Sequence, residues 1–161
     1  MNAYIYQVNV KPQREGERGL PKHAVESARV TPHGIIGDFN RYRQEKLHGS
    51  LSRALLIMPL EMIETFNQEG WPVQAGDIGE NITTKGVAYS DFVIGARYQL
   101  GEIEVEISER ATPCGNLKLL PYIGTSKWQE FRRVMTERRG YYAKVLKEGQ
   151  IQKNDLVSRI F

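Results

Sequence analysis

Hydrophobic and polar residues alternate along much of this chain, and the alternation predicts β-strands. Near the start, Tyr4, Tyr6, Val8 and Val10 stand at every second position. Other segments rich in apolar, β-branched or aromatic residues also have strand length and are bounded by glycine or polar turns. We expect strands or strand pairs in these segments: residues 24–31, 53–58, 76–86, 97–108, 141–146 and 155–160.

Two segments repeat apolar residues with the period of an α-helix instead. One runs from Pro59 to Gly70 and the other from Thr125 to Arg139, followed by Gly140. Proline suits the first turn of a helix and glycine suits its end. We interpret the apolar stripes as core-packing faces: Leu60, Ile63 and Phe66 in the first helix, and Trp128, Phe131, Val134 and Met135 in the second.

The sum of these elements is a mainly β fold with peripheral helices. No repeat or shift in composition divides the chain, so we expect one barrel-like domain over residues 1–161. The polar, turn-rich stretch from Gly37 to Ser50 reads as a long exposed loop. Loops of that length within a compact domain are more often functional than idle.

Charge and targeting signals narrow the class of protein. The chain has 22 basic and 19 acidic residues, a balance that does not demand a nucleic-acid partner. No stretch approaches the roughly 20 apolar residues that span a bilayer. The first residues also lack the basic and apolar regions of a signal peptide. We expect a cytoplasmic protein that acts without a membrane or nucleic acid.

Local runs of charge have two interpretations each. Glu102, Glu104 and Glu106 fall on one face of a strand, which is typical of a solvated sheet face rather than a metal site. Clustered basic residues indicate either a solvated face or a site for phosphate or another small anion. They fall in two groups: Arg132, Arg133, Arg138 and Arg139, and Arg41, Arg43 and Lys46.

The single cysteine, Cys114, lies in the stretch ERATPCGNL. One cysteine excludes an intramolecular disulfide and a multi-cysteine zinc site, and a free thiol suits a reducing compartment. A lone cysteine is usually inert packing. Here Pro113 fixes one backbone angle and Gly115 permits positive φ, so we expect the thiol on a shaped turn.

Five further polar residues stand at turns next to expected strands: Lys22, Asp38, His48, Arg53 and Asn81. Each has a structural interpretation. Asp38 and Asn81 can cap turns, His48 can be a surface residue, and Arg53 can pair with a carboxylate. Periodicity alone does not bring these side chains together.

The order of several motifs resembles the MOSC domain, the C-terminal domain of molybdenum-cofactor sulfurases, in its stand-alone bacterial form. The motifs are SARVTPHGIIGD, LHGSLSRALL, AGDIGENIT, ERATPCGNL and RRGYYAKVLKEGQIQKNDLV. The resemblance spans about Gly19 to Val157, and it implies a mostly β, barrel-like fold that agrees with the strand pattern.

The resemblance implies that Cys114 is the functional cysteine and ligates the metal of a molybdenum cofactor (molybdopterin). A thiolate is a soft donor for such a metal. The resemblance also implies that Asn81 contacts the cofactor. Lys22 and Arg53 follow as anion contacts in preference to the helix arginines, and Asp38 and His48 line the site.

The sequence departs from the family pattern at two places. Ser50 and Ser52 stand where the family commonly has a glycine and an acidic residue, which puts the substrate chemistry in question. Asn154 stands where glycine is usual and affects a turn.

Three functions remain open. The first is a molybdenum-cofactor-dependent oxidoreductase that reduces a small N-hydroxylated base. Its electrons come from a separate donor protein, because no flavin, haem or iron–sulfur motif is present. The second is a non-catalytic carrier of the cofactor or its sulfur. The third is a metal-free thiol protein, for which none of the histidines is a convincing base.

Overall fold

The computed structural model describes residues 2–12, 20–39 and 50–161. In this part of the chain, eight strands form one sheet in the order β11-β7-β8-β9-β5-β6-β1-β2, and three form a second sheet in the order β10-β3-β4. The strand bounds are β1 (Tyr4–Val10), β2 (His23–Val25), β3 (Ser27–Thr31), β4 (Gly34–Ile35), β5 (Leu55–Pro59), β6 (Ile82–Lys85), β7 (Arg97–Leu100), β8 (Ile103–Arg110), β9 (Tyr141–Lys147), β10 (Gly149–Gln152) and β11 (Val157–Ile160).

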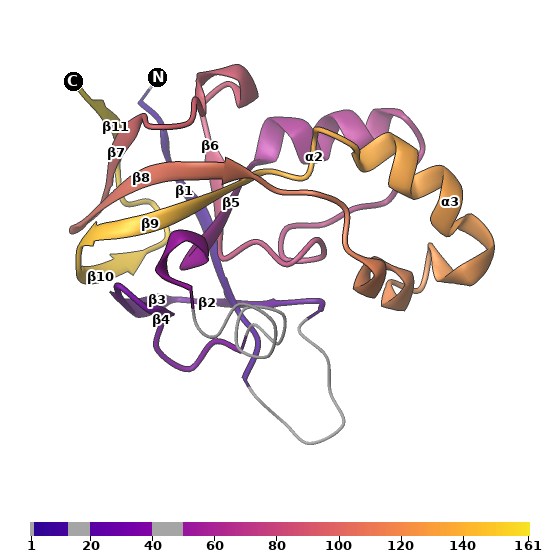
Figure 1. Cartoon of the computed structure of the whole chain (residues 1–161), viewed down its shortest axis with the longest axis horizontal. Coiled ribbons are helices and arrows are strands. Elements are labelled where there is room, and N and C mark those ends of the chain that lie inside the picture. The colour runs from indigo at the N-terminus through magenta and orange to yellow at the C-terminus, as the bar shows by residue number, and fades with distance from the viewer. Residues whose placement is uncertain (1, 13–19, 40–49) are drawn as a thin grey trace.

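Two α-helices lie together on one side of the larger sheet (Figure 1). They are α2 (Leu60–Gln68) and α3 (Gly124–Met135), and both bury their apolar stripes in a shared cluster. Short 3-10 turns connect other elements: η1 (Leu51–Arg53), η2 (Tyr89–Asp91) and η3 (Gly115–Leu119). The mainly β fold with peripheral helices is therefore confirmed.

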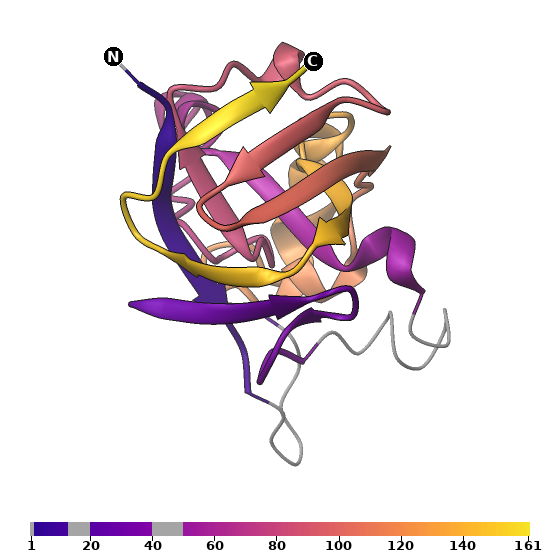
Figure 2. The same ribbon diagram turned by 90° about the vertical axis from the view of Figure 1, so that its left-hand side faces the viewer.

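The sheets curve around an apolar core without closing into a barrel (Figure 2). Residues from both sheets meet in that core, for example Val30 and Ile151 from the smaller sheet and Val105 from the larger one. The described ladder has β11 at one edge and β2 at the other. An isolated bridge between Tyr4 and Leu156 links the regions near β1 and β11. The expected barrel-like shape thus describes the curvature but not a continuous ring of strand pairs.

Strand β5 is the central element that positions the site. All five of its residues are buried. The main core covers Leu55 and Ile57, whereas Met58 packs in the cluster under α2 and α3 and Leu56 packs in a small separate cluster. Burial on both faces explains why the sequence here is continuously apolar rather than alternating. Strand β5 pairs in parallel with β6 and antiparallel with β9. It therefore lies next to both segments that carry the candidate site.

Several strand bounds differ from the sequence prediction. The segment 24–31 is not one strand, because β2 pairs with β1 in the larger sheet while β3 pairs with β10 in the smaller one. Residues 76–81 form a turn, and the strand begins only at Ile82. Arg53 ends η1 instead of starting a strand. Strand β10 was not expected, whereas the strand at 4–10 and the hairpin at 97–108 are confirmed.

The second helix ends four residues earlier than predicted, at Met135. Glu137 has a positive φ of 65°, so the chain leaves the helical path there. Gly140 then approaches β5 so closely that an added Cβ would lie 2.5 Å from the carbonyl oxygen of Ile57. This close contact fixes where the chain turns into β9. As a result Arg138 and Arg139 lie beyond the helix and not on its exposed face.

Glu104 and Glu106 lie on one face of β8, whereas Glu102 lies in the hairpin turn before it, where its carboxylate accepts the Gln150 N–H at 2.8 Å. Glu106 contacts Arg97 at 3.1 Å and Lys144 at 3.3 Å. Within the described residues, no group of three or more His, Cys, Asp or Glu side chains is placed to hold a metal ion. These observations support the interpretation of a solvated face.

None of the helices in the described residues is long and apolar enough to cross a lipid bilayer.

Phe131 gives a test of the packing beneath α3. Its fully buried ring lies 5.0 Å from the ring of Trp71, centroid to centroid. We expect Phe131→Ala to lower the free energy of unfolding by roughly 3–5 kcal/mol, measured by urea denaturation, because the substitution leaves a cavity. The exposed Phe161 is the control, and Phe161→Ala should change stability by less than about 0.5 kcal/mol. Similar losses in the two variants would contradict this account of the core.

Candidate functional site

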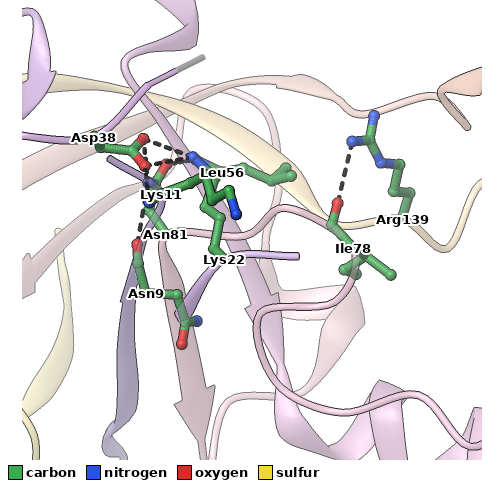
Figure 3. A network of polar contacts seen from close by, with 8 residues as sticks. All are labelled: Asn9, Lys11, Lys22, Asp38, Leu56, Ile78, Asn81 and Arg139. Atoms are coloured by element: carbon green, nitrogen blue, oxygen red, sulfur yellow. Dashed lines mark hydrogen bonds and ion pairs between the residues drawn. The ribbon is translucent and has the colours of Figure 1, made fainter. Parts of the chain in front are cut away.

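A buried polar network joins three of the predicted site residues (Figure 3). The ammonium group of Lys22 lies 2.6 Å from Oδ2 of Asp38, and both side chains are almost fully buried. The amide of Asn81 donates to the same carboxylate at 2.9 Å. Asp38 also accepts a hydrogen bond from the backbone N–H of Lys11 at 2.8 Å. Opposite charge and hydrogen bonds together compensate for burying the carboxylate.

Asn81 holds the neighbouring strands through both ends of its amide. Its Oδ1 accepts from the backbone N–H of Leu56 at 3.1 Å, and its Nδ2 reaches Asp38 and the carbonyl of Asn9. Its backbone N–H donates to the Leu56 carbonyl at 2.8 Å. A primary amide has two donor hydrogens, and both have internal acceptors here. The expected contact between Asn81 and a cofactor stays a prediction, because the amide already holds β5 to the Asp38 loop.

The turn at residues 76–80 needs glycine at two positions. Gly76 has a φ of 93°, and a Cβ there would lie 2.3 Å from the carbonyl oxygen of Lys22. The Gly76 carbonyl accepts the Lys22 N–H at 2.9 Å, so this approach fixes the Lys22 backbone. Gly79 has a φ of 91°, and its Cβ would meet Leu20 at 2.6 Å. Only glycine fits such conformations at such distances without strain.

Glu80 is a buried acid inside this turn. Its Oε1 accepts from the Gly76 N–H at 2.6 Å and from the Thr83 hydroxyl at 2.9 Å, while its Oε2 is buried with no partner among the described residues. Burial raises the pKa of the Glu80 carboxyl to about 7, an effect that the bond from Gly76 partly opposes. Glu80 therefore stabilises the turn best in its neutral form.

Cys114 stands at the start of η3 as a free, half-buried thiol. Its carbonyl accepts the Leu117 N–H at 3.0 Å, so the thiol sits on a turn as expected. Gly115 is not among the residues with positive φ, so the expected reason for that glycine is wrong. A Cβ on Gly115 would have no neighbour within 4 Å. The residue next to the thiol thus borders open space.

Arg139 ties the Cys114 segment to the Asn81 turn. Its Nη1 donates to the Thr112 carbonyl at 2.7 Å, and its Nη2 donates to the Ile78 carbonyl at 3.1 Å (Figure 3 shows the Ile78 bond). Thr112 precedes Cys114 by two residues, and Ile78 precedes Asn81 by three. Arg139 is only 7% exposed. One buried cation therefore sets the two candidate loops side by side.

Leu56 of β5 provides a second connection between the same loops. Its backbone bonds to Asn81, and its side chain packs with Ala111 and Tyr142. Ala111 in turn donates its N–H to the carbonyl of Gly140 at 2.9 Å. The segment that leads to Cys114 is therefore anchored on β5, the same strand that holds Asn81 through the Leu56 backbone.

Arg53 does not offer an open charge to a ligand. Its guanidinium makes two bonds to Glu109, at 2.5 and 3.0 Å, and lies 4.9 Å from the centroid of the Tyr142 ring. This is the structural interpretation of Arg53, a pairing with a carboxylate. Tyr142 also contacts the Leu56 and Ala111 pair, so Arg53 borders the site from the side of β9.

The structure thus brings together Lys22, Asp38 and Asn81, and connects them to Cys114 through Arg139 and Leu56. His48 lies outside the described residues. Sequence reasoning missed Arg139 because it was grouped with neighbouring arginines on an expected helix face. It also missed Glu80, although its place between Gly79 and Asn81 in a glycine-marked turn was a signal.

The chemistry of these residues fits a metal-bearing anionic cofactor in part. A half-buried free thiol suits a thiophilic metal, and a buried guanidinium suits an anion. The Nε of Arg139 is buried with no partner among the described residues. By contrast, Lys22 and Arg53 already face carboxylates. Cys114 and Arg139 are therefore the residues whose chemistry fits such a cofactor.

Comparison with known protein families agrees with this fold. The family model described as the MOSC domain matches residues 44–158. This chain therefore belongs to the MOSC domain family, and the resemblance seen in its motifs is confirmed.

Related proteins are similar at low identity. A protein named Reductase from Gibberella moniliformis is 30% identical over 132 residues, which are 78% of this chain and 22% of that protein. YiiM from Escherichia coli is 27% identical over 138 residues, or 81% of this chain and 59% of YiiM. YflK from Bacillus subtilis is 28% identical over 70% of this chain and 51% of its own length. The chain spans less than two thirds of each of these relatives.

Solved structures share the fold. The crystal structure of YiiM from Geobacillus stearothermophilus has a TM-score of 0.73 at 24% identity and covers 99% of this chain and 75% of its own. That of YUAD from Bacillus subtilis has a TM-score of 0.74 at 15% identity, with 98% and 94% covered. At these identities the likeness shows the fold alone.

The buried ion pair should contribute far more to stability than an exposed one. We expect Asp38→Asn to lower the free energy of unfolding by roughly 3–5 kcal/mol, because it removes the charge facing a buried ammonium group. The control is Glu148→Gln, which breaks the half-exposed pair with Arg29 and should cost at most about 1 kcal/mol. Equal losses in denaturant titrations of the two variants would show that the Asp38 charge is not essential.

Glu80 should make stability depend on pH in a specific direction. Because its folded pKa of about 7 lies above the ordinary value of 4.5, its contribution is complete below about pH 4.5 and is lost as the pH rises through 7. Glu80→Gln removes this titration. We expect the stability deficit of Glu80→Gln relative to the wild type to shrink between pH 5 and pH 8, measured by urea denaturation. A deficit that stays constant over this range would contradict the raised pKa.

Proposed function

We propose that this protein binds the molybdenum cofactor with Cys114 as a ligand of the metal, and that it is an oxidoreductase acting on small N-hydroxylated compounds. One observation carries the proposal: a buried cation, Arg139, joins the segment of a free thiol to the turn before Asn81. Membership of the MOSC family supports it. So does the similarity to a protein named Reductase, although the chain spans only 22% of that protein.

Each part of the site has a role in this proposal. Cys114 supplies a soft sulfur donor at the edge of open space beside Gly115. Arg139 supplies positive charge next to an anionic group. The Lys22–Asp38–Asn81 network keeps the surrounding turns fixed, so that little order has to be imposed when a ligand binds. When bound, the cofactor supplies two-electron redox chemistry at molybdenum.

The proposed reaction converts an N–OH group to N–H, which takes two electrons and two protons and releases water. The chain has no motif for flavin, haem or an iron–sulfur cluster, so the proposal includes a separate electron-donor protein. The reducing cytoplasm is the proposed place of action, because it keeps the Cys114 thiol free.

A second candidate is a carrier that binds the cofactor or its sulfur without turnover. One observation favours it. The family commonly has a carboxylate in the region of Ser52, whereas here the hydroxyls of Ser50 and Ser52 lie 2.9 Å apart. A hydroxyl pair is a poor proton donor near neutral pH compared with a carboxylic acid of raised pKa. A protein with this pair can hold the cofactor and still lack the group that protonates a substrate.

The metal content of Cys114→Ala tests the ligand role. The protein is made in a host that synthesises the cofactor, and molybdenum and pterin are measured in the purified protein. We expect Cys114→Ala to lose molybdenum by about tenfold or more, since removing a ligand exceeds the effect of an outer contact. Leu119→Ala is the control, because Leu119 is exposed on the same 3-10 turn. Molybdenum retained in Cys114→Ala at the level of the control would overturn the ligand assignment.

Activity separates the enzyme from the carrier. Wild-type protein with bound cofactor is mixed with a reduced viologen dye and an N-hydroxylated nucleobase, and formation of the N–H product is followed. Turnover supports the oxidoreductase. Bound cofactor without turnover, even with this direct chemical reductant, would favour the carrier.

A further inference from the structure

Among the described residues Lys22 and Arg139 are the buried cations, and only Lys22 faces a carboxylate. Arg139 as a whole residue is 7% exposed, and its guanidinium donates two hydrogen bonds, to the carbonyls of Thr112 and Ile78. No carboxylate in the described residues forms an ion pair with it, and its buried Nε has no partner there. Carbonyl groups satisfy two of the donors but do not neutralise the charge.

Three other cations near the site each face a carboxylate. Arg138, the next residue along the chain, makes two bonds to Glu69 at 2.8 and 2.9 Å. Lys22 faces Asp38, and Arg53 faces Glu109. An arginine stays charged at every physiological pH, so it cannot lower the cost of burial by losing its proton. Burying a charge without a counter-ion is strongly unfavourable. An anionic ligand next to Arg139 would offset this free-energy cost of burial.

The position of Arg139 indicates where that partner lies. Its Nη1 is 2.7 Å from the carbonyl oxygen of Thr112, and Thr112 is two residues from Cys114. Two residues of extended chain span at most about 7 Å. On the other side, a Cβ on Gly79 would lie 3.6 Å from Nη2, so the backbone of that turn approaches the charge without an intervening side chain. The positive potential of Arg139 is therefore felt around the thiol.

We propose that Arg139 makes the space around Cys114 selective for anionic small molecules, independently of any metal. The ligand class is a small molecule that brings its negative charge, such as a phosphate or carboxylate, next to the sulfur. The inference rests on the proposed function in taking Cys114 as the ligand-binding residue. Its test uses protein without cofactor, so the two can fail separately.

The single cysteine allows a direct measurement of this selectivity. Iodoacetate and iodoacetamide both alkylate a thiolate: the sulfur forms a bond to the CH₂ carbon and iodide leaves. The first reagent is an anion and the second is neutral. Because the same thiolate reacts with both, the ratio of the two rates cancels the thiolate fraction and general access. The ratio, compared with that of a free thiol such as N-acetylcysteine amide, reports the local potential.

We expect the ratio of iodoacetate to iodoacetamide rates to be higher for wild-type protein at low salt than for the free thiol. Arg139→Met should lower it by about two- to fourfold, the size expected for one charge at roughly 10 Å with an effective dielectric constant of about 40–80, because the reagent approaches the half-buried thiol from water. Arg139→Lys should keep most of it. Arg133→Met is the matched control, because it removes the same charge from the exposed face of α3. The control should leave the ratio nearly unchanged.

Three results would overturn the proposal. The first is an unchanged ratio in a folded Arg139→Met protein, and the second is an equal decrease in Arg133→Met. The third is a wild-type ratio equal to or below that of the free thiol. This third result needs no variant, so it tests the proposal even if Arg139→Met does not fold. If the selectivity is found but no molybdenum cofactor binds, the inference stands and the proposed function fails.

Discussion

The buried ion pair between Lys22 and Asp38 connects segments that the strand ladder alone does not hold together. Lys22 precedes β2 and Asp38 follows β4. Asn81 connects the Asp38 carboxylate to β5 and β6. Charges removed from water are favourable only with good geometry and with the remaining bonds made. Here Lys11, Lys22 and Asn81 all donate to one carboxylate, so these conditions are met. The positions of the Lys22 and Asp38 segments relative to the Asn81 turn depend on this pair.

Residues at the site fall into those that shape it and those whose chemistry faces a ligand. Asn81, Glu80 and Asp38 use their polar groups on the protein itself, and the glycines of the 76–80 turn let the backbones approach. Cys114 is half-buried and free, and Arg139 has no carboxylate partner in the part of the chain that the structure describes. Pre-organised binding requires a rigid polar frame around the few groups that face the ligand, here the Cys114 thiol and the Arg139 guanidinium.

The fold was largely predictable from the sequence, whereas the site was predictable only by motif. Alternation along β1, β7 and β8 and the apolar stripe of α3 depend on local periodicity, which a sequence carries directly. The separation of β2 from β3 and the early end of α3 depend on pairing with distant strands, which local patterns do not carry. Arg139 shows the same limit. Arg132 and Arg133 of the same cluster are exposed and Arg138 is half-buried, whereas Arg139, next to the close approach of Gly140 to Ile57, lies in the interior.

The way that β1 meets the residues just before β11 has a consequence for the order of folding. Ile5 exchanges backbone hydrogen bonds with Asn154 and Asp155, and Ala3 accepts from Val157. Such contacts close one of the longest loops available to the chain, and contacts of large sequence separation form slowly. Asn9, on the same strand, bonds to the backbone of Asn81. Arg139, which joins the Cys114 segment to the Asn81 turn, comes late in the chain, so a nascent chain lacks that connection until residue 139 has been synthesised.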